Sequence, residues 1–377
     1  MNTKWQILII IKKLNTRKDM KLNKAILLSL FVFTLLPKIT WAQKQQPNVL
    51  WILTDDQRYD AISAFNKMID GQEMSKLGYI ESPKVDKLTR EGTTFINTYC
   101  QATGCAPSRA SMHYGRYPFR SGVYEFEYHN NNASSSKPTL PEQMATLGYE
   151  TLHIGKLGVR LKTKEGGKLK SAKIYQQDIS FKELRKDGLT GWGKDWFDEI
   201  NGEKIKRQNV EFFVTEEGEF QYISKELENK LPNYKGTAKK AMEEYDLLRH
   251  YNKKKGPLTP FTPGICSRKA GETRDGYYTQ FFKKYLDSES KKFKAGSREF
   301  KGVNPDKPLF CQIGFDFPHT PVLPPASYRE RFKKHTYNVP SFDKKELETM
   351  PKQLKKQVEA GYSDHFKDAE KQKMIQD

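Results

Sequence analysis

Cysteine is scarce in this chain of 377 residues, which holds four, at positions 100, 105, 266 and 311. No two of them form a Cys-x-x-Cys pair that would suggest zinc, and four are too few for a disulfide scaffold. Long apolar runs are also lacking. The run from Ala25 to Leu36 is shorter than the roughly 20 residues that a membrane span needs. These absences leave a globular protein without a stable membrane span.

Acidic residues are in deficit, with 46 Asp and Glu against 65 Lys and Arg, which gives a formal charge of +19. Residues 1–42 hold eight Lys or Arg and one Asp, so they contribute +7 and leave +12 on the rest. A positive excess favours polyanionic partners. The chain has no RNA- or DNA-binding motif, which argues against nucleic acid. If the chain is exported, a sulfated polysaccharide fits this charge better than nucleic acid. The alternative is a lysine-rich surface that serves solubility only.

The N-terminus has the pattern of a secretory signal peptide. Lys21 and Lys24 precede the apolar run, and Ala42 offers a small residue for cleavage. Met20 would be the more ordinary start. We therefore predict an N-terminal extension with a signal peptide over 1–42, and a secreted or periplasmic mature protein. The alternative is a buried N-terminal helix.

Short apolar runs alternate with helices that carry end signals, which is the order of an α/β sheet flanked by helices. The first run is expected to be a buried, central, parallel strand. The helix over 82–92 begins with Ser-Pro and ends at Gly. The predicted strands are Asn48–Thr54, Thr93–Tyr99, Tyr149–Ile154 and Pro308–Phe315, and a second helix is expected over Thr139–Leu147.

One long stretch breaks this alternation. Residues from about 161 to 302 are rich in Lys and Glu and have scattered aromatic residues, including Trp192 and Trp196. We expect an insertion over the active-site face, because loops on a rigid scaffold often carry specificity. Residues 344–377 are charged and helix-prone, and no strand follows them. The single large domain is predicted over 43–377.

The stretch Cys105-Ala106-Pro107-Ser108-Arg109, followed by Gly115-Arg116, is the most informative part of the sequence. It resembles the signature of the sulfatase family, Cys-x-Pro-Ser-Arg and then Gly-Arg. The resemblance implies a mixed, mostly parallel, alkaline-phosphatase-like α/β fold. It also implies that a formylglycine-generating or sulfatase-maturating enzyme oxidises Cys105 to formylglycine, whose hydrate attacks the sulfur of a sulfate ester. The family usually has an apolar residue and Thr where this chain has His113-Tyr114, a difference expected to affect packing.

A metal site is expected where the first strand ends, at Asp55-Asp56. Ligand sites in open α/β sheets form at the carboxyl ends of strands, and paired carboxylates suit Ca²⁺ or Mg²⁺. Taken alone, two adjacent Asp residues more often serve a turn or a helix cap. The resemblance implies that Asp55 and Asp56 are the first pair of metal ligands in a sulfatase site, with Cys105 as a further ligand.

Three more residues are assigned roles by the resemblance. Arg109 and Lys156 are expected to hold the sulfate oxygens, and His319, in His-Thr-Pro after the last strand, to contact the sulfate or protonate the leaving alcohol. The family's Gly-Lys-x-His element has its histidine where this chain has Gly158. His153 lies nearby, but we interpret it as a histidine on the strand surface.

The expected metal site and sheet are incomplete on the C-terminal side. A sulfatase takes a second pair of metal ligands from a later strand, and Ca²⁺ binds six to eight oxygens. Ser363-Asp364-His365 is a tempting match, but no buried strand precedes it, so we reject it. The resemblance covers about 47–160 and 305–377 and stops before the second pair, which predicts a half-built metal site in a truncated chain.

The sequence thus favours a sulfuric ester hydrolase that acts on a sulfated polysaccharide or glycosaminoglycan, with iduronate-2-sulfatase-like or arylsulfatase-like members as relatives. Two alternatives stay open. One is a phosphonate or phosphodiester hydrolase of the same superfamily. The other is a catalytically inactive glycan-binding fragment, suggested by Gly158 and by the missing C-terminal ligands.

Overall fold

A computed structural model describes residues 46–376, except for 126–137, 160, 166–167, 172, 189–190, 224–226, 228–234, 253–255, 262, 341–344 and 360–367. By internal contacts the chain divides into two units, Met1–Gln46 and Pro47–Asp377, and all the helices and strands named in this section lie in the second. The predicted signal peptide lies outside the described residues, and none of the described helices has the length and apolarity of a membrane span.

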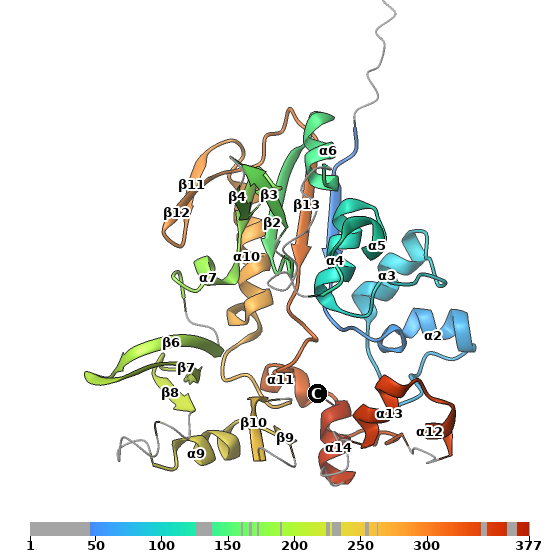
Figure 1. Cartoon of the computed structure of the whole chain (residues 1–377), viewed down its shortest axis with the longest axis vertical. Helices are drawn as coiled ribbons and strands as arrows, with labels where there is room; N and C mark the ends of the chain where they lie inside the picture. Colours follow the sequence, from blue (N-terminus) through green and yellow to red (C-terminus); the bar gives the residue numbers. More distant parts are fainter. Residues whose placement is uncertain are drawn as a thin grey trace, which may run out of the picture. The chain divides into compact units, whose positions relative to one another are not determined.

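The core of the second unit is a four-stranded sheet in which every pairing is parallel (Figure 1). A row of four isoleucines crosses it, formed by Ile52, Ile313, Ile154 and Ile179 in register. This confirms the expected mixed α/β fold with a mostly parallel sheet. The strand order is β1 (Val49–Leu53), β13 (Leu309–Gly314), β2 (Glu150–Gly155) and β5 (Gln177–Ile179).

The position predicted for the first strand is wrong. β1 lies at the edge of the sheet and β13 lies beside it in the interior, where all six of its residues are buried. Leu50 and Ile52 are about half exposed, so one face of β1 is uncovered by the described residues. A continuous apolar run does not distinguish a strand covered on both faces from one covered on a single face.

Two helical layers cover the opposite faces of β13 and its neighbours, because successive side chains of a strand alternate between faces. On one face, Leu309, Cys311 and Ile313 join the cluster built by α10 (Arg274–Asp287). On the other face, Phe310 packs in the cluster that contains Ala106 and Ala110 of α4 (Cys105–Tyr114). Figure 1 shows α10 and α4 on opposite sides of β13.

The local helix signals are confirmed and one strand signal is wrong. α3 (Pro83–Glu91) has Pro in its first turn, and α6 (Leu140–Thr146) has a capping box between Thr139 and Glu142. Residues 93–99 form no strand, and Phe95 and Tyr99 are largely exposed. An alternating pattern needs a neighbouring strand to pair with, and this segment has none among the described residues.

Residues 161–302 are only partly an insertion, because they supply β5 to the central sheet and α10 to the layer that covers it. The boundary between this insertion and the rest of the domain stays a prediction. The remaining strands are β3 (Lys162–Glu165), β4 (Lys168–Ser171), β6 (Trp192–Ile200), β7 (Glu203–Val214), β8 (Phe220–Ile223), β9 (Arg249–Asn252), β10 (Gly256–Phe261), β11 (Lys292–Ala295) and β12 (Arg298–Lys301). All of their pairings are antiparallel.

The remaining helices are short. They are η1 (Tyr59–Ala61), α2 (Ser63–Asp70), α5 (Pro118–Ser121), α7 (Phe181–Leu184), α9 (Thr237–Glu244), η3 (Ala270–Glu272), α11 (Ala326–Arg329), α12 (Glu346–Thr349), α13 (Lys352–Glu359) and α14 (Asp368–Gln376). The helices expected after residue 344 are therefore present.

The sheet interior predicts a clear stability contrast. Ile154→Ala removes a side chain with no exposed area, and a cavity of this kind costs about 2–5 kcal/mol of unfolding free energy. Leu88→Ala, on an exposed face of α3, should change it by less than about 0.5 kcal/mol. Urea unfolding monitored by circular dichroism measures both. Equal effects would mean that β2 does not lie in the core.

Candidate active site

Polar side chains from three loops meet at the carboxyl ends of three neighbouring parallel strands. Asp55 and Asp56 follow β1, Lys156 follows β2 and His319 follows β13. The backbone N–H of Asp55 donates to the carbonyl of Phe317, at 3.1 Å, which ties the loop after β1 to the neighbouring loop after β13. Residues predicted from separate parts of the sequence are thus brought to one place.

Asp55 is the centre of this group. Its side chain is 6% exposed, and its carboxylate pairs with Lys156 and, at 3.2 Å, with the guanidinium of Arg109. Burial alone would raise the pKa of Asp55, but the ammonium of Lys156 and the guanidinium of Arg109 outweigh it and lower the pKa. The carboxylate therefore stays charged in a nearly closed site.

Asp56 and His319 form the solvent-exposed side of the group. Asp56 has a φ of 62°, a left-handed conformation uncommon outside glycine. His319 Nε2 lies 3.9 Å from Asp56 Oδ2, and His319 Nδ1 lies 2.7 Å from the carbonyl oxygen of Thr320. A carbonyl only accepts, so Nδ1 carries a proton and donates it to Thr320, while Nε2 faces Asp56.

Cys105 is the first residue of α4, where the free backbone N–H groups and the helix dipole favour an anion. Its side chain is partly exposed. Ligand atoms of Cys105, Asp55 and Asp56 all lie within 4.8 Å of one another. The catalytic precursor and the carboxylate pair expected from the sequence are therefore neighbours.

These three residues fit half of a coordination sphere for a hard cation. Two carboxylates suit Ca²⁺ or Mg²⁺, whereas a thiol is a soft ligand; an oxygen at position 105 would complete a hard set. The described residues supply three of the six to eight positions that Ca²⁺ takes. The rejected candidate Ser363-Asp364-His365 lies outside the described residues.

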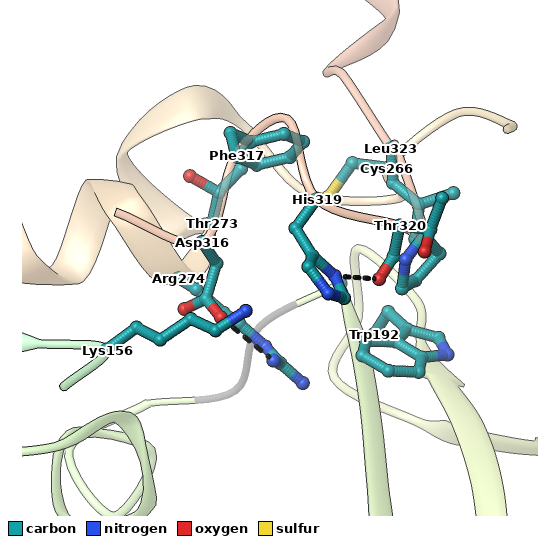
Figure 2. Close-up of a pocket in the computed structure, with 12 residues that line it drawn as sticks. Lys156, Trp192, Cys266, Thr273, Arg274, Asp316, Phe317, His319, Thr320 and Leu323 are labelled. Carbon is teal, nitrogen blue, oxygen red and sulfur yellow. Dashed lines mark hydrogen bonds and ion pairs between the residues drawn. The ribbon is translucent and has the colours of Figure 1, made fainter. Parts of the chain in front are cut away.

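A cavity of about 360 Å³ opens beside the group, with Lys156 and His319 in its wall (Figure 2). No sequence motif singled out most of the other residues that line it. Trp192, at the start of β6, and Arg274, at the start of α10, come from the stretch 161–302. The sequence signal nearest to Arg274 is the helix cap Thr273, whose hydroxyl accepts from the N–H of Gly276 at 3.0 Å.

Asp275, the next residue along α10, braces the loop that carries His319. Its carboxylate accepts from the backbone N–H of Asp316 at 2.8 Å and from that of Phe317 at 3.0 Å. Burial raises the pKa of Asp275 to about 6, against the effect of these two bonds. The sequence contained no pattern that would have identified this residue.

Comparison with known proteins decides the family. A model of the family described as Sulfatase matches residues 47–367. The chain belongs to the sulfatase family. This confirms the resemblance carried by residues 105–116 and the alkaline-phosphatase-like fold that it implies.

Individual sulfatases match over shorter stretches. An ulvan-active sulfatase of Formosa agariphila is 29% identical over 148 residues, 39% of this chain and 25% of that protein. Human N-acetylgalactosamine-6-sulfatase is 32% identical over 122 residues, 30% of this chain and 22% of that protein. The solved phosphonate monoester hydrolase of Agrobacterium radiobacter shares 16% identity, with a TM-score of 0.44, over 79% of this chain and 45% of that one. The matches thus span from about a fifth to just under half of each relative.

Gly158, the departure from the sulfatase pattern, has a steric explanation. A Cβ at this position would lie 2.5 Å from Cδ of Arg109 and 2.6 Å from its Nε. Arg109 NH1 donates to the carbonyls of Lys156, at 2.9 Å, and Leu157, at 3.3 Å. In this sulfatase the arginine occupies the space that a side chain at 158 would need.

The second departure, His113, is a buried polar link between α4 and the sheet. Its Nδ1 lies 2.7 Å from the carbonyl of Arg109 and its Nε2 lies 3.1 Å from Gln312 Oε1. The hydroxyl of Tyr175 donates to the same oxygen at 2.5 Å. Burial lowers the pKa of His113. The expectation that this position concerns packing is consistent with its location.

His153 lies inside the sheet, and its expected place on the strand surface is wrong. The residue is 4% exposed on β2, and its ring lies 5.3 Å from that of Tyr175. Burial lowers the pKa of His153 to about 3. Its ring packs against Tyr175, which belongs to the buried cluster that contains Ala106 and Ala110 of α4.

Gly158→Ala tests the contact with Arg109, with Gly71→Ala as the matched control. Both glycines have positive φ, 68° and 76°, so each substitution carries the left-handed penalty of about 1 kcal/mol. At Gly71 the new methyl group meets nothing within 4 Å. We expect Gly158→Ala to lower the unfolding free energy by about 1–3 kcal/mol more. Equal losses in denaturant unfolding would show that Arg109 moves aside without cost.

Asp275→Asn should destabilise the protein more at pH 4 than at pH 7, by about 2 kcal/mol. The folded-state pKa of about 6 exceeds the ordinary 3.8, so the carboxyl's contribution is fully present below pH 4. It is lost as the pH rises through 6. Unfolding free energies of both proteins at several pH values measure the difference, and Asp70→Asn, on an exposed residue, is the comparison. A cost independent of pH would contradict the raised pKa.

Proposed function

We propose that this sulfatase hydrolyses sulfate esters of an anionic polysaccharide, with the reacting residue derived from Cys105. The observation that carries the proposal is the meeting of Cys105, at the start of α4, with Asp55, Asp56, Lys156 and His319. An anionic ester group placed there would face a helix N-terminus and several cationic side chains.

The proposed partner in maturation is an enzyme that converts Cys105 to formylglycine. Once converted, position 105 would supply a hydrated aldehyde, with one hydroxyl as nucleophile and a second that allows the aldehyde to be restored. An exposed site suits modification by an enzyme, and the Cys105 side chain is partly exposed.

Asp55, Asp56 and the oxygen at position 105 would hold the proposed Ca²⁺, with Mg²⁺ as the other candidate. Such an ion supplies Lewis-acid polarisation of the ester oxygens. The remaining work belongs to the chain's own side chains. Lys156 and Arg109 lie against Asp55 and orient the ester oxygens through charge-assisted bonds.

His319 is the proposed proton donor to the departing alcohol. Its Nδ1 proton is engaged by the carbonyl of Thr320, so Nε2 is the atom that delivers a proton and takes one back. Its ring lies next to Asp56 and also lines the cavity, where the alcohol part of a substrate would lie.

A sulfated polysaccharide or glycosaminoglycan is the proposed substrate, and secretion or the periplasm the proposed location. The support is the +12 charge of residues 43–377, the signal-like pattern in 1–42, and relatives described as acting on ulvan and on N-acetylgalactosamine-6-sulfate.

Turnover by the full chain, co-expressed with a maturating enzyme, tests the proposal. Sulfate release from ulvan and from glycosaminoglycans is measured for wild type, Cys105→Ala and Cys100→Ala. We expect Cys105→Ala to lose at least about 1,000-fold, because the nucleophile is removed, and Cys100→Ala, at an exposed free cysteine five residues earlier, to keep activity.

Two other results would contradict the proposal. Faster cleavage of aryl phosphate diesters than of aryl sulfates would favour the phosphodiesterase alternative. Polysaccharide binding without sulfate release, together with an unmodified Cys105 thiol in peptide mass spectrometry, would favour an inactive glycan-binding protein.

A further inference from the structure

The cavity beside the reacting group contains a second cationic site, distinct from the side chains that surround Asp55. Arg274 enters it from α10, and Trp192 enters it from β6 (Figure 2). Lys156 and His319 line the same cavity. A molecule whose sulfate ester lies beside Lys156 and His319 would therefore share this cavity with Trp192 and Arg274.

Arg274 is held in place by two aromatic rings. Its guanidinium carbon lies 4.4 Å from the ring centroid of Phe181 and 4.6 Å from that of Trp192. Stacking of this kind fixes a planar guanidinium while its edge stays available for hydrogen bonds. The side chain is 25% exposed, so it is restrained and still reachable from the cavity.

The charge of Arg274 is only loosely matched within the protein. Its NH1 lies 3.7 Å from Asp316 Oδ1, which is longer than a direct hydrogen bond. The other oxygen of Asp316 accepts the hydroxyl of Tyr278 at 2.6 Å. Among the described residues that line the cavity, Asp316 is the one acid, against two basic residues, Lys156 and Arg274.

One part of the remaining wall is apolar, and it suits the face of a sugar ring that carries C–H groups. It is formed by Trp192 together with Phe317, Pro321 and Leu323. Sites for small ligands combine such a wall with a few well-placed polar groups. The cavity thus offers one flat aromatic surface and one restrained cation beside it.

We propose that Trp192 and Arg274 bind the sugar unit that carries the scissile sulfate or its neighbour, and select units with a second anionic group. The sugar packs on Trp192, and a carboxylate or a second sulfate pairs with Arg274. The proposal rests on the proposed function for the position of the scissile sulfate.

Binding to the Cys105→Ala chain tests this without requiring turnover. Titration calorimetry compares three disaccharides with the same sulfate ester: one without other charges, one with a hexuronate carboxylate, and one with a second sulfate. We expect Arg274→Met to weaken the two dianionic ligands about 10- to 100-fold, the effect of losing a charge-assisted bond, and the monoanionic ligand less than about threefold. The two dianionic ligands distinguish a carboxylate from a sulfate as the selected group.

Arg298→Met is the matched control. Arg298 also lies over an aromatic ring, 4.9 Å from the Phe300 centroid, and also pairs with an aspartate, Asp178, at 3.7 Å. It does not line the cavity, so affinity for all three ligands should be unchanged. Trp192→Ala should weaken all three alike, by about 2- to 10-fold.

The possible results separate ligand selection from the proposed hydrolysis. Equal weakening of all three ligands by Arg274→Met would make Arg274 a positioning residue for the Asp316 loop and would overturn the proposal. Selective binding by the Cys105→Ala chain, together with no sulfate release by the wild-type chain co-expressed with a maturating enzyme, would uphold it and contradict the proposed hydrolysis. If Arg274→Met unfolds, Arg274→Gln serves instead: it removes the charge, so the preference for dianionic ligands should be lost, and its persistence in the folded variant would overturn the proposal.

Discussion

The carboxylate of Asp55 is the interaction on which the rest of the site depends. It follows β1, yet its partners come from α4 and from the end of β2. One nearly buried negative charge therefore ties the helix that begins at Cys105 to two strands of the sheet. Breaking such a group by removing one partner leaves a buried charge without compensation, which is strongly unfavourable. The geometry around position 105 is thus coupled to the integrity of the sheet.

The elements that could be predicted are those whose signals are local. Pro83 and the Thr139–Glu142 box indicated helix starts, and the motif at 105–116 indicated the family, because these patterns act within a few residues. Asp55, Lys156 and His319 were identified through the family resemblance, and each follows a strand. Their roles stay a proposal, although the structure brings the side chains together.

The features that could not be predicted are those set by distant neighbours. β1 is an edge strand because β13, about 260 positions later, takes the interior place, and Thr93–Tyr99 has no strand to pair with among the described residues. Arg274 gains its position from two rings, Phe181 and Trp192, that lie over 80 residues away in the chain. Contacts across such separations leave no periodic trace in the sequence.

β13 has a further consequence through its alternation. Its odd-numbered residues belong to the core beneath α10, and its even-numbered residues, Phe310 and Gln312, face the helix that begins at Cys105. The strand thus separates two hydrophobic clusters, one on each of its faces, and contributes side chains to both. The loop that carries His319 follows the end of this strand, so repacking on either face would shift His319 relative to Cys105, even though neither residue is substituted.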